Sequence, residues 1–161
     1  MGYPGAGKTT ISKVIHELTG AKHLSSDNTR FQLFKNPSFS PEEHEALYKA
    51  LDAQTEKLLS EGKDVIYDAN LNRLQHRHEK YDICQRTGAS SVLVWVKTPL
   101  ELAKQRAVTE HRLHLVPRDE TLASMFERIA GIIEEPAGDE PYVEIDGSNV
   151  SKQMVADSLN L

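Results

Sequence analysis

The sequence predicts an α/β protein with a doubly wound parallel sheet, and three observations support this expectation. Short runs of apolar β-formers alternate along the chain with longer stretches of helical periodicity, which is the pattern of βαβ units. Glycines and capping residues separate these segments at most boundaries. The length of 161 residues, with 39% hydrophobic and 27% charged residues, fits one globular domain. We therefore expect a single domain over residues 1–161.

Helices are expected at residues 7–18, 41–60, 73–87, 98–111 and 150–159, with a further helix capped by Asp119. The first has apolar residues at spacings of three and four, and Gly20 follows it as a C-terminal cap. Ser40-Pro41-Glu42-Glu43 and Thr98-Pro99-Leu100-Glu101 both match a capping box with proline at the first helical position.

Strands are expected at residues 21–25, 65–67, 92–96 and 142–145, where β-branched and aromatic residues are concentrated. A further strand would normally precede the glycine-rich segment that begins at Gly2, giving about five strands in the middle of three layers. Only Met1 stands before Gly2. The first strand has either been cut off or, as we prefer, lies upstream in a longer reading frame.

The segment Gly2-Tyr3-Pro4-Gly5-Ala6-Gly7-Lys8-Thr9 matches the phosphate-binding pattern G-x-x-x-x-G-K-[ST] at every fixed position. Glycines allow backbone N–H groups to turn toward phosphates, the lysine supplies a positive charge, and the threonine hydroxyl can bind Mg²⁺. A glycine-rich turn before an ordinary helix is the alternative. The residues expected to bind ATP are Gly2, Pro4, Gly5, Ala6, Gly7, Lys8, Thr9 and Thr10, and Lys8 is also expected to be catalytic.

Two aspartates are expected at strand ends, next to the phosphate-binding segment. Asp27 follows the strand at 21–25, and Asp68 follows Val65-Ile66-Tyr67. Because all strands of a parallel sheet end at the same edge, both carboxylates should face the γ-phosphate. One could hold Mg²⁺ together with Thr9 while the other accepts a proton from an attacking hydroxyl, and which does which stays open. Helix caps or loop carboxylates are the alternative.

A basic stretch at about residues 106–117 is expected to form a small helical lid. It contains Arg106, His111, Arg112 and His114 and breaks before Val116-Pro117. Mobile arginines over the phosphates would stabilise charge in the transition state and exclude water. A solvated helix face is the alternative.

At this point the chain resembles a known family, the polynucleotide 5′-hydroxyl kinases and their zeta toxin-like relatives. The resemblance covers most of the chain. It rests on the phosphate-binding segment, on Asp27-Asn28-Thr29-Arg30 as an Asp-x-x-Arg signature, on Asp68-Ala69-Asn70-Leu71-Asn72, and on the stretch from Arg106 to Pro117 followed by Met125-Phe126. Three features depart from the family: the first strand is missing, Ala69 replaces a frequent hydroxyl residue, and the lid is about one residue longer, which leaves the alignment of its arginines loose.

The resemblance implies roles for individual residues. Asp27 would be the general base, and Arg30 would bind a phosphate or other acidic group of the substrate. Asp68 and Asn70 would also lie on the substrate side. Arg112, with Arg106 as the neighbouring candidate, would be the lid arginine, and adenine would lie near Gly147.

These observations predict a kinase that transfers the γ-phosphate of ATP, with Mg²⁺, to a hydroxyl of a nucleic-acid end or a small molecule. A regulatory ATP-binding NTPase and a zeta toxin-like kinase of a nucleotide sugar are the alternatives. The net charge of −5 disfavours a long nucleic acid. With one cysteine, Cys84, and no apolar run of the roughly 18 residues that a membrane helix needs, we expect a cytoplasmic protein without an obligate protein partner.

Overall fold

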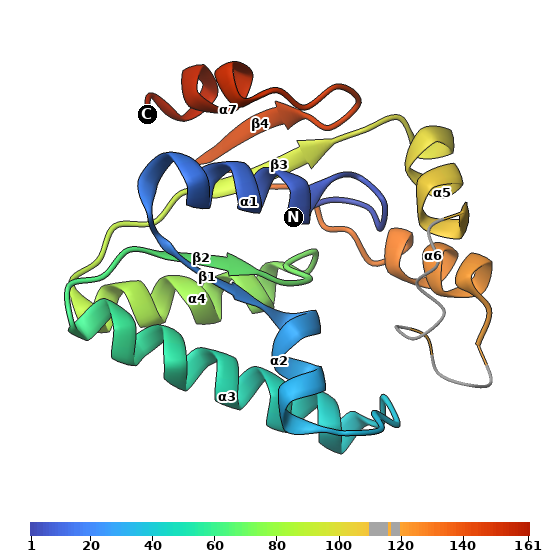
Figure 1. Ribbon diagram of the computed structural model, residues 1–161, viewed down its shortest axis with the longest axis horizontal. Coiled ribbons are helices and arrows are strands. Elements are labelled where there is room, and N and C mark those ends of the chain that lie inside the picture. Colours follow the sequence, from blue (N-terminus) through green and yellow to red (C-terminus); the bar gives the residue numbers. More distant parts are fainter. Residues whose placement is uncertain (110–115, 117–119) are drawn as a thin grey trace.

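The structure is a computed structural model that describes residues 1–109, 116 and 120–161 (Figure 1). Helices and strands alternate along the chain. Their order is α1 (Lys8–Thr19), β1 (Lys22–Ser25), α2 (Ser26–Leu33), α3 (Pro41–Ser60), β2 (Val65–Asp68), α4 (Leu74–Thr87), β3 (Leu93–Lys97), α5 (Leu100–Thr109), α6 (Leu122–Ala130), β4 (Tyr142–Asp146) and α7 (Lys152–Leu159). The predicted α/β class is confirmed.

The four strands form two parallel pairs in the described part of the chain. In the first pair, β1 lies beside β2 with Lys22 opposite Val65; in the second, β3 lies beside β4 with Leu93 opposite Tyr142. Figure 1 shows the strands ending on the same side of the molecule, where the loop before α1 and the start of α2 also lie. The topology therefore gathers the strand ends around the phosphate-binding segment, as expected for a parallel arrangement.

The two strand pairs contribute to separate hydrophobic clusters. One hydrophobic cluster joins Ile11 of α1 and Val155 of α7 to Val96 and Ile145 of the second pair. Another joins Leu51 of α3 to Leu24 and Ala69 beside the first pair. Figure 1 shows α3 and α4 along the face of the β1–β2 pair that is turned away from α1.

Met1 lies between the two strand pairs and already pairs with β3. Its amino nitrogen donates a hydrogen bond to the Val94 carbonyl at 2.6 Å, and its carbonyl accepts one from the Val96 N–H at 3.0 Å. These two bonds form one unit of a parallel ladder, opposite Trp95. Beyond Met1 a cavity of about 730 Å³ separates β2 from β3.

Two local predictions were wrong. Asp27 does not end a strand: Ser25 is the N-cap of a helix that was not predicted, its hydroxyl accepts from the Asn28 N–H at 3.4 Å, and Asp27 lies in the first turn. Likewise the N-cap of α6 is Thr121, whose hydroxyl accepts from the Ser124 N–H at 3.1 Å. Asp119, the predicted cap, lies outside the described residues. None of the helices in the described ranges has the length and apolar character needed to cross a bilayer.

Candidate active site

The phosphate-binding segment, residues 2–9, forms a tight loop against helix α5 and is called the P-loop below. Gly5 has φ of 76°, and a Cβ there would lie 2.2 Å from the Ala103 carbonyl oxygen and 2.8 Å from the Ala107 N–H nitrogen. Both alanines are buried. Only glycine therefore satisfies this backbone angle and this contact, which explains the central glycine of the motif.

Helix α1 begins at the end of the P-loop without a capping side chain. Its N-cap is Gly7, with φ of 102°, and no side chain accepts from the first turn, whereas Ser25, Ser40, Thr121 and Ser151 cap other helices in that way. The first turn of α1 also contains no acidic residue. The N–H groups and positive dipole end of α1 are therefore suited to an anion.

Lys8 folds its side chain back across the P-loop. Its Nζ donates hydrogen bonds to the carbonyl oxygens of Gly2 at 2.9 Å and Tyr3 at 2.8 Å. The ammonium group is thereby held at the loop itself rather than extended into solvent. Thr9 follows in the first turn of α1, half-buried, and Thr10 is exposed. The predicted ATP-binding residues are thus contiguous around one helix end.

Asn72 fixes the start of the P-loop, a role that the sequence did not reveal. Its Oδ1 accepts from the Gly2 N–H at 3.0 Å, and its Nδ2 donates to the Gly2 carbonyl at 3.4 Å. The side chain is almost fully buried. Asn70, predicted on the substrate side, accepts from the Asn72 N–H at 3.2 Å and so shapes the turn that presents Asn72. In the sequence, the only sign of this role is that Asn72 follows Asn70 by two residues.

The loop after β4 lies directly against the P-loop. A Cβ at Gly147 would lie 2.0 Å from the Ala6 carbonyl oxygen, so only glycine fits there. The Thr98 hydroxyl donates to that same carbonyl at 2.9 Å. Thr98 was expected to cap a helix; its hydroxyl instead joins the residue after β3 to the P-loop.

Arg106 binds the loop after β4. Its Nη1 donates to the Gly147 carbonyl at 2.7 Å and its Nη2 to the Ser148 carbonyl at 2.8 Å. Two residues predicted separately for the nucleotide, Arg106 and Gly147, are therefore in direct contact. Arg106 belongs to the last turn of α5, which ends at Thr109. Of the predicted lid beyond that helix only Val116 is described, and Arg112 lies outside the described residues.

The two predicted carboxylates have different surroundings. Asp68, at the end of β2, is buried and its Oδ2 lies 3.0 Å from His23 Nε2 on the neighbouring strand. Asp27 is exposed in the first turn of α2. Over residues 1–109, 116 and 120–161 no group of three or more His, Cys, Asp or Glu side chains could hold a metal ion by itself. Mg²⁺ usually keeps several waters and binds through substrate phosphates with one or two protein oxygens, and Thr9 with an aspartate fits that donor set.

The guanidinium group of Arg30 is buried and lacks a full set of hydrogen-bond partners within the described part of the chain. Only 8% of the residue is exposed, and Nη1 is the buried side-chain atom without a hydrogen-bond partner among the described residues. Its nearest carboxylate, Glu43, is 4.0 Å away and also accepts from the Ser38 and Phe39 N–H groups. The guanidinium carbon lies 4.8 Å from the centre of the Phe39 ring. Buried unpaired charge is costly, so this position is suited to binding an anion.

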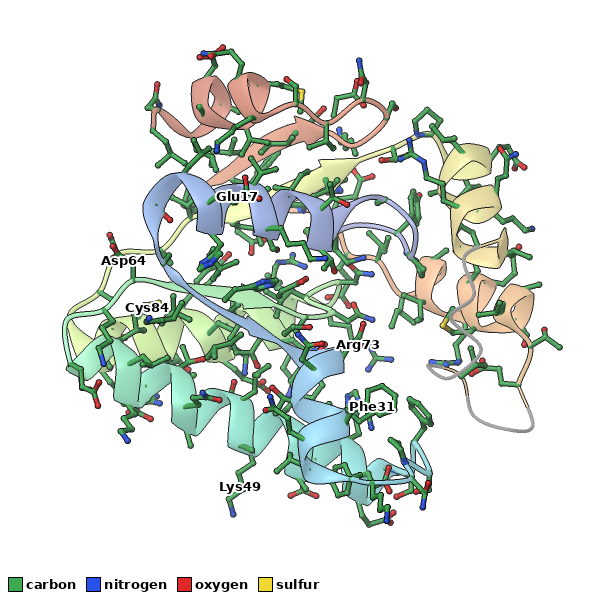
Figure 2. All side chains as sticks on the ribbon, in the orientation of Figure 1. Glu17, Phe31, Lys49, Asp64, Arg73 and Cys84 are labelled. Atoms are coloured by element: carbon green, nitrogen blue, oxygen red, sulfur yellow. The ribbon has the colours of Figure 1, made fainter. Side chains whose placement is uncertain are left out.

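Aromatic side chains line the surroundings of Arg30. Phe39 has an unusual positive φ of 58°, and the rings of His44 and Tyr48 are 4.6 Å apart. Burial, with Arg30 nearby, lowers the pKa of His44, and burial raises the pKa of Tyr48 to about 12, so both rings are neutral near pH 7. Figure 2 shows Phe31 of α2 on the side where the strands end, with Asp64 and Cys84 on the opposite side.

Comparisons with known proteins agree with this geometry. A family model described as an AAA domain matches residues 1–128. A search of curated proteins found no match.

Three similar solved structures share the fold. An unliganded sugar kinase from Janibacter sp. HTCC2649 aligns with a TM-score of 0.69 at 19% identity, covering 99% of this chain and 90% of that chain. A putative kinase from Chloroflexus aurantiacus gives 0.76 at 15% identity, covering 98% and 92%. The Mycobacterium tuberculosis APS kinase CysC, solved with AMPPNP and APS, gives 0.68 at 19% identity, covering 100% and 95%.

At these identities the likeness establishes the fold, which is that of the P-loop kinases, and it does not single out the polynucleotide kinases that the sequence resembles. The family model spans most of the chain, 128 of 161 residues. This chain therefore belongs to the AAA-domain family of P-loop proteins.

Proposed function

We propose that this protein is an ATP-dependent kinase that transfers the γ-phosphate to a hydroxyl group of a small, negatively charged acceptor. The observation that carries the proposal is the uncapped start of α1 at Gly7, with Lys8 held beside it and a buried, incompletely paired Arg30 on the neighbouring α2. The first feature suits the phosphates of ATP, and the second suits an anionic group on the acceptor.

On the nucleotide side, the P-loop N–H groups and Lys8 bind the phosphates in this proposal. Asn72 and Thr98 keep the loop in shape through Gly2 and Ala6. Arg106 holds the backbone of Gly147 and Ser148, which supports adenine binding at that loop. Thr9 and one of the two aspartates would hold Mg²⁺, which would supply positive charge to neutralise the phosphates.

On the acceptor side, Asp27 acts as the base. The acceptor oxygen forms a bond to the γ-phosphorus, the bond from that phosphorus to the bridging oxygen of ADP breaks, and the hydroxyl proton passes to the Asp27 carboxylate. Asp27 suits this role because it is exposed, whereas Asp68 is buried beside His23. Arg30, one helical turn after Asp27, binds the acceptor's anionic group and orients the hydroxyl.

The net charge of −5 favours a small-molecule acceptor over nucleic acid. The similar structures, which include a sugar kinase and an APS kinase, favour it as well. A nucleic-acid 5′ end is the second candidate, because its phosphates would also match Arg30 and the Asp-x-x-Arg signature resembles that family. A nucleotide sugar as acceptor would combine small size with phosphates that match Arg30. A regulatory NTPase would need no acceptor.

The test is a transfer screen with γ-labelled ATP against sugar acids, phosphosugars, nucleotide sugars, nucleoside monophosphates, neutral sugars and 5′-hydroxyl oligonucleotides. We expect labelled product with an anionic small molecule and none with the Lys8→Ala variant. Labelled oligonucleotide alone would favour the second candidate. Hydrolysis that no acceptor accelerates, together with normal ATP binding, would contradict the kinase proposal and favour a regulatory NTPase.

A further inference from the structure

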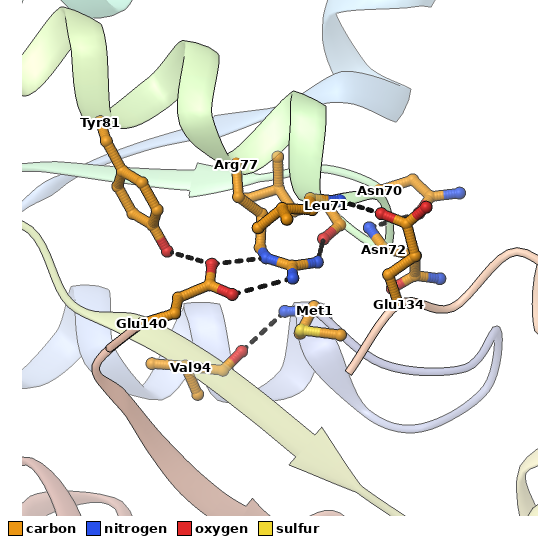
Figure 3. Close-up of polar contacts among 10 residues, drawn as sticks. Met1, Asn70, Leu71, Asn72, Arg77, Tyr81, Val94, Glu134 and Glu140 are labelled. Carbon is orange, nitrogen blue, oxygen red and sulfur yellow. Dashed lines mark hydrogen bonds and ion pairs between the residues drawn. The ribbon is translucent and has the colours of Figure 1, made fainter. Parts of the chain in front are cut away.

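Residues 131–141, which connect α6 to β4, are called the α6–β4 segment below. The proposed reaction does not use this segment, yet it carries two glutamates whose side-chain partners are 59 to 63 positions away in the sequence. Glu140 binds α4, and Glu134 binds the turn between β2 and α4 (Figure 3). That turn contains Asn72, which holds Gly2 of the P-loop. The segment is therefore one residue away from the phosphate site.

Glu134 holds the turn between β2 and α4 at two points. Its backbone N–H donates to the Asn72 carbonyl at 2.8 Å, and its carboxylate accepts from the N–H of Leu74, the first residue of α4. Arg73, the N-cap of α4, contributes no capping side chain. Glu134 takes that place and puts a negative charge at the positive end of the helix dipole. Both ends of the turn from Asn72 to Leu74 are thus fixed by one residue.

The other end of the α6–β4 segment is held by a buried ion pair. The Nε and Nη2 atoms of Arg77 donate to the Glu140 oxygens at 2.6 and 2.9 Å, and its Nη1 donates to the Leu71 carbonyl at 3.2 Å (Figure 3). The Tyr81 hydroxyl donates to Glu140 at 2.7 Å. Hydrogen bonds from Arg77 first, and from Tyr81, lower the pKa of Glu140 below its usual value. The segment is therefore fastened to α4 at both of its ends.

Asn72 and Lys8 share a partner, the Gly2 carbonyl. That oxygen accepts from Lys8 Nζ at 2.9 Å and from Asn72 Nδ2 at 3.4 Å. The other carbonyl that Lys8 binds, that of Tyr3, also accepts from the Ala6 N–H at 3.1 Å. A carbonyl left without a donor would oppose any movement of Lys8 toward a phosphate. Because each carbonyl has a second donor, Lys8 can leave both of them.

We propose that Glu134 is a positioning residue for the phosphate site and acts through Asn72. Glu134 keeps Asn72 opposite Gly2, and Asn72 in turn keeps the Gly2 carbonyl paired when Lys8 turns to the phosphates of ATP. The proposal rests on the proposed function, because it takes the P-loop as the site for ATP. In this arrangement the α6–β4 segment links the chain after α6 to the first residue of the P-loop.

The experiment measures the Kd for ATP by isothermal titration, which requires neither an acceptor nor transfer. Asn72→Ala should raise this Kd about tenfold or more, and Glu134→Ala about fivefold, because each removes a hydrogen bond that holds the P-loop. In Glu134→Gln a side-chain oxygen still accepts from the Leu74 N–H, so the Kd should stay within about twofold of that of the parent chain. Glu135→Ala, at the exposed neighbouring position of the same segment, is the control and should not change the Kd.

A double-mutant cycle tests whether Glu134 acts through Asn72. In the Asn72→Ala background, Glu134→Ala should change the Kd for ATP less than about twofold, because the residue through which it acts has already been removed. Effects of the two substitutions that multiply would overturn the proposal, and so would a glutamine variant as weak as the alanine variant. If Asn72→Ala does not fold, Asn72→Ser takes its place in the cycle.

Failure of this proposal and failure of the proposed function give different results. A parent chain that binds no ATP would contradict both. ATP binding that is equally tight in the parent chain and in Glu134→Ala would contradict the positioning role alone, and a lower free energy of unfolding in that variant would then make Glu134 a helix cap only. Normal ATP binding without transfer to any acceptor would contradict the kinase and leave the positioning role intact.

Discussion

The nucleotide side and the acceptor side of the candidate site are built in opposite ways. On the nucleotide side, the groups that form the P-loop are paired within the chain: Lys8 with Gly2 and Tyr3, and Thr98 with Ala6. On the acceptor side, around α2 and the start of α3, Arg30 is buried with one nitrogen lacking a hydrogen-bond partner, and Phe39 has a positive φ. On the nucleotide side these pairs hold the loop in shape, while the uncapped start of α1 is left for an anion. On the acceptor side the incompletely paired and strained groups store unfavourable energy that an anion would relieve.

The largest expected effect is on the nucleotide side. Replacing Lys8 by alanine should lower kcat/KM for phosphoryl transfer by roughly a thousandfold or more, because its ammonium group is the charge that the P-loop itself offers to the phosphates. Steady-state transfer assays measure this loss. Lys13, exposed on the same helix, provides the matched control, and Lys13→Ala should change the rate less than twofold. Comparable losses in both variants would show that the effect is not specific to the P-loop.

The Asp27→Asn variant distinguishes an effect on the acceptor side from an effect on the nucleotide side. It should lower kcat by about 10²- to 10⁴-fold while leaving the Kd for ATP within twofold, because the carboxylate acts on the acceptor proton. Isothermal titration with ATP and transfer assays measure the two quantities. Asp64, a carboxylate just before β2 at the opposite end of the strands, is the control, and Asp64→Asn should have no effect (Figure 2). If ATP affinity falls together with kcat, Asp27 belongs to the nucleotide side.

Arg30→Met tests whether the acceptor side trades stability for binding. The KM for an anionic acceptor should rise about 10- to 100-fold, whereas the free energy of unfolding should change by less than about 1 kcal/mol, since an incompletely paired buried charge is removed. Urea denaturation and acceptor titration measure both. Arg86, paired with Glu56 on the surface, is the control. A large loss of stability with unchanged KM would make Arg30 a structural residue.

The amino terminus gives a pH prediction on stability. The Met1 amine has its pKa lowered from 8.0 to about 5 by burial first, with Lys8 and Arg77 adding to the decrease and Asp68 opposing it. Between these values the unfolded chain binds more protons, so stability is highest above pH 8 and falls by at most roughly 1.4 kcal/mol per unit as pH decreases toward 5. Acetylation of Met1 should abolish this slope in urea titrations. A slope that survives acetylation would assign it to other groups.

Arg106→Gln should give the smallest effect. Losing the bonds to Gly147 and Ser148 should raise the KM for ATP about five- to tenfold and change kcat less than threefold, because Arg106 positions a loop and does not touch the reacting atoms. Lys104→Gln on the same helix, paired with Glu127 at the surface, is the control. A drop in kcat without a change in KM would make Arg106 a catalytic arginine, as the family resemblance implies.

Sequence signals that act within a few residues, such as helix caps, predicted the helix boundaries well. Helix α3 begins at Pro41 and ends at Ser60, as expected, because Ser40 caps it and Gly62 follows it. Even here the reciprocal half of the capping box differs, since Glu43 accepts from Ser38 and Phe39 instead of Ser40. Helix α2 was missed because its aspartate, asparagine and threonine favour turns as much as helices.

Contacts between distant residues could not be predicted. Thr98 has the sequence context of an N-cap, yet its hydroxyl bonds to Ala6, far away in the chain. Likewise His23 reaches Asp68 because β1 and β2 are parallel and adjacent, and Asn72, in the loop after β2, reaches Gly2, which is 70 residues away in the sequence. The glycine-rich loop before α1 could be predicted because its motif is local, whereas the incomplete pairing of Arg30 depends on burial between α2 and α3, which sequence spacing does not encode.

The contact between Gly5 and the alanine face of α5 constrains how the enzyme can move. With a backbone approach this close, α5 cannot rotate or slide relative to the P-loop without a steric clash. The two therefore behave as a single rigid body, and Arg106 also joins α5 to the loop after β4. Replacing Ala103 or Ala107 by a larger residue would therefore displace the backbone of the P-loop itself.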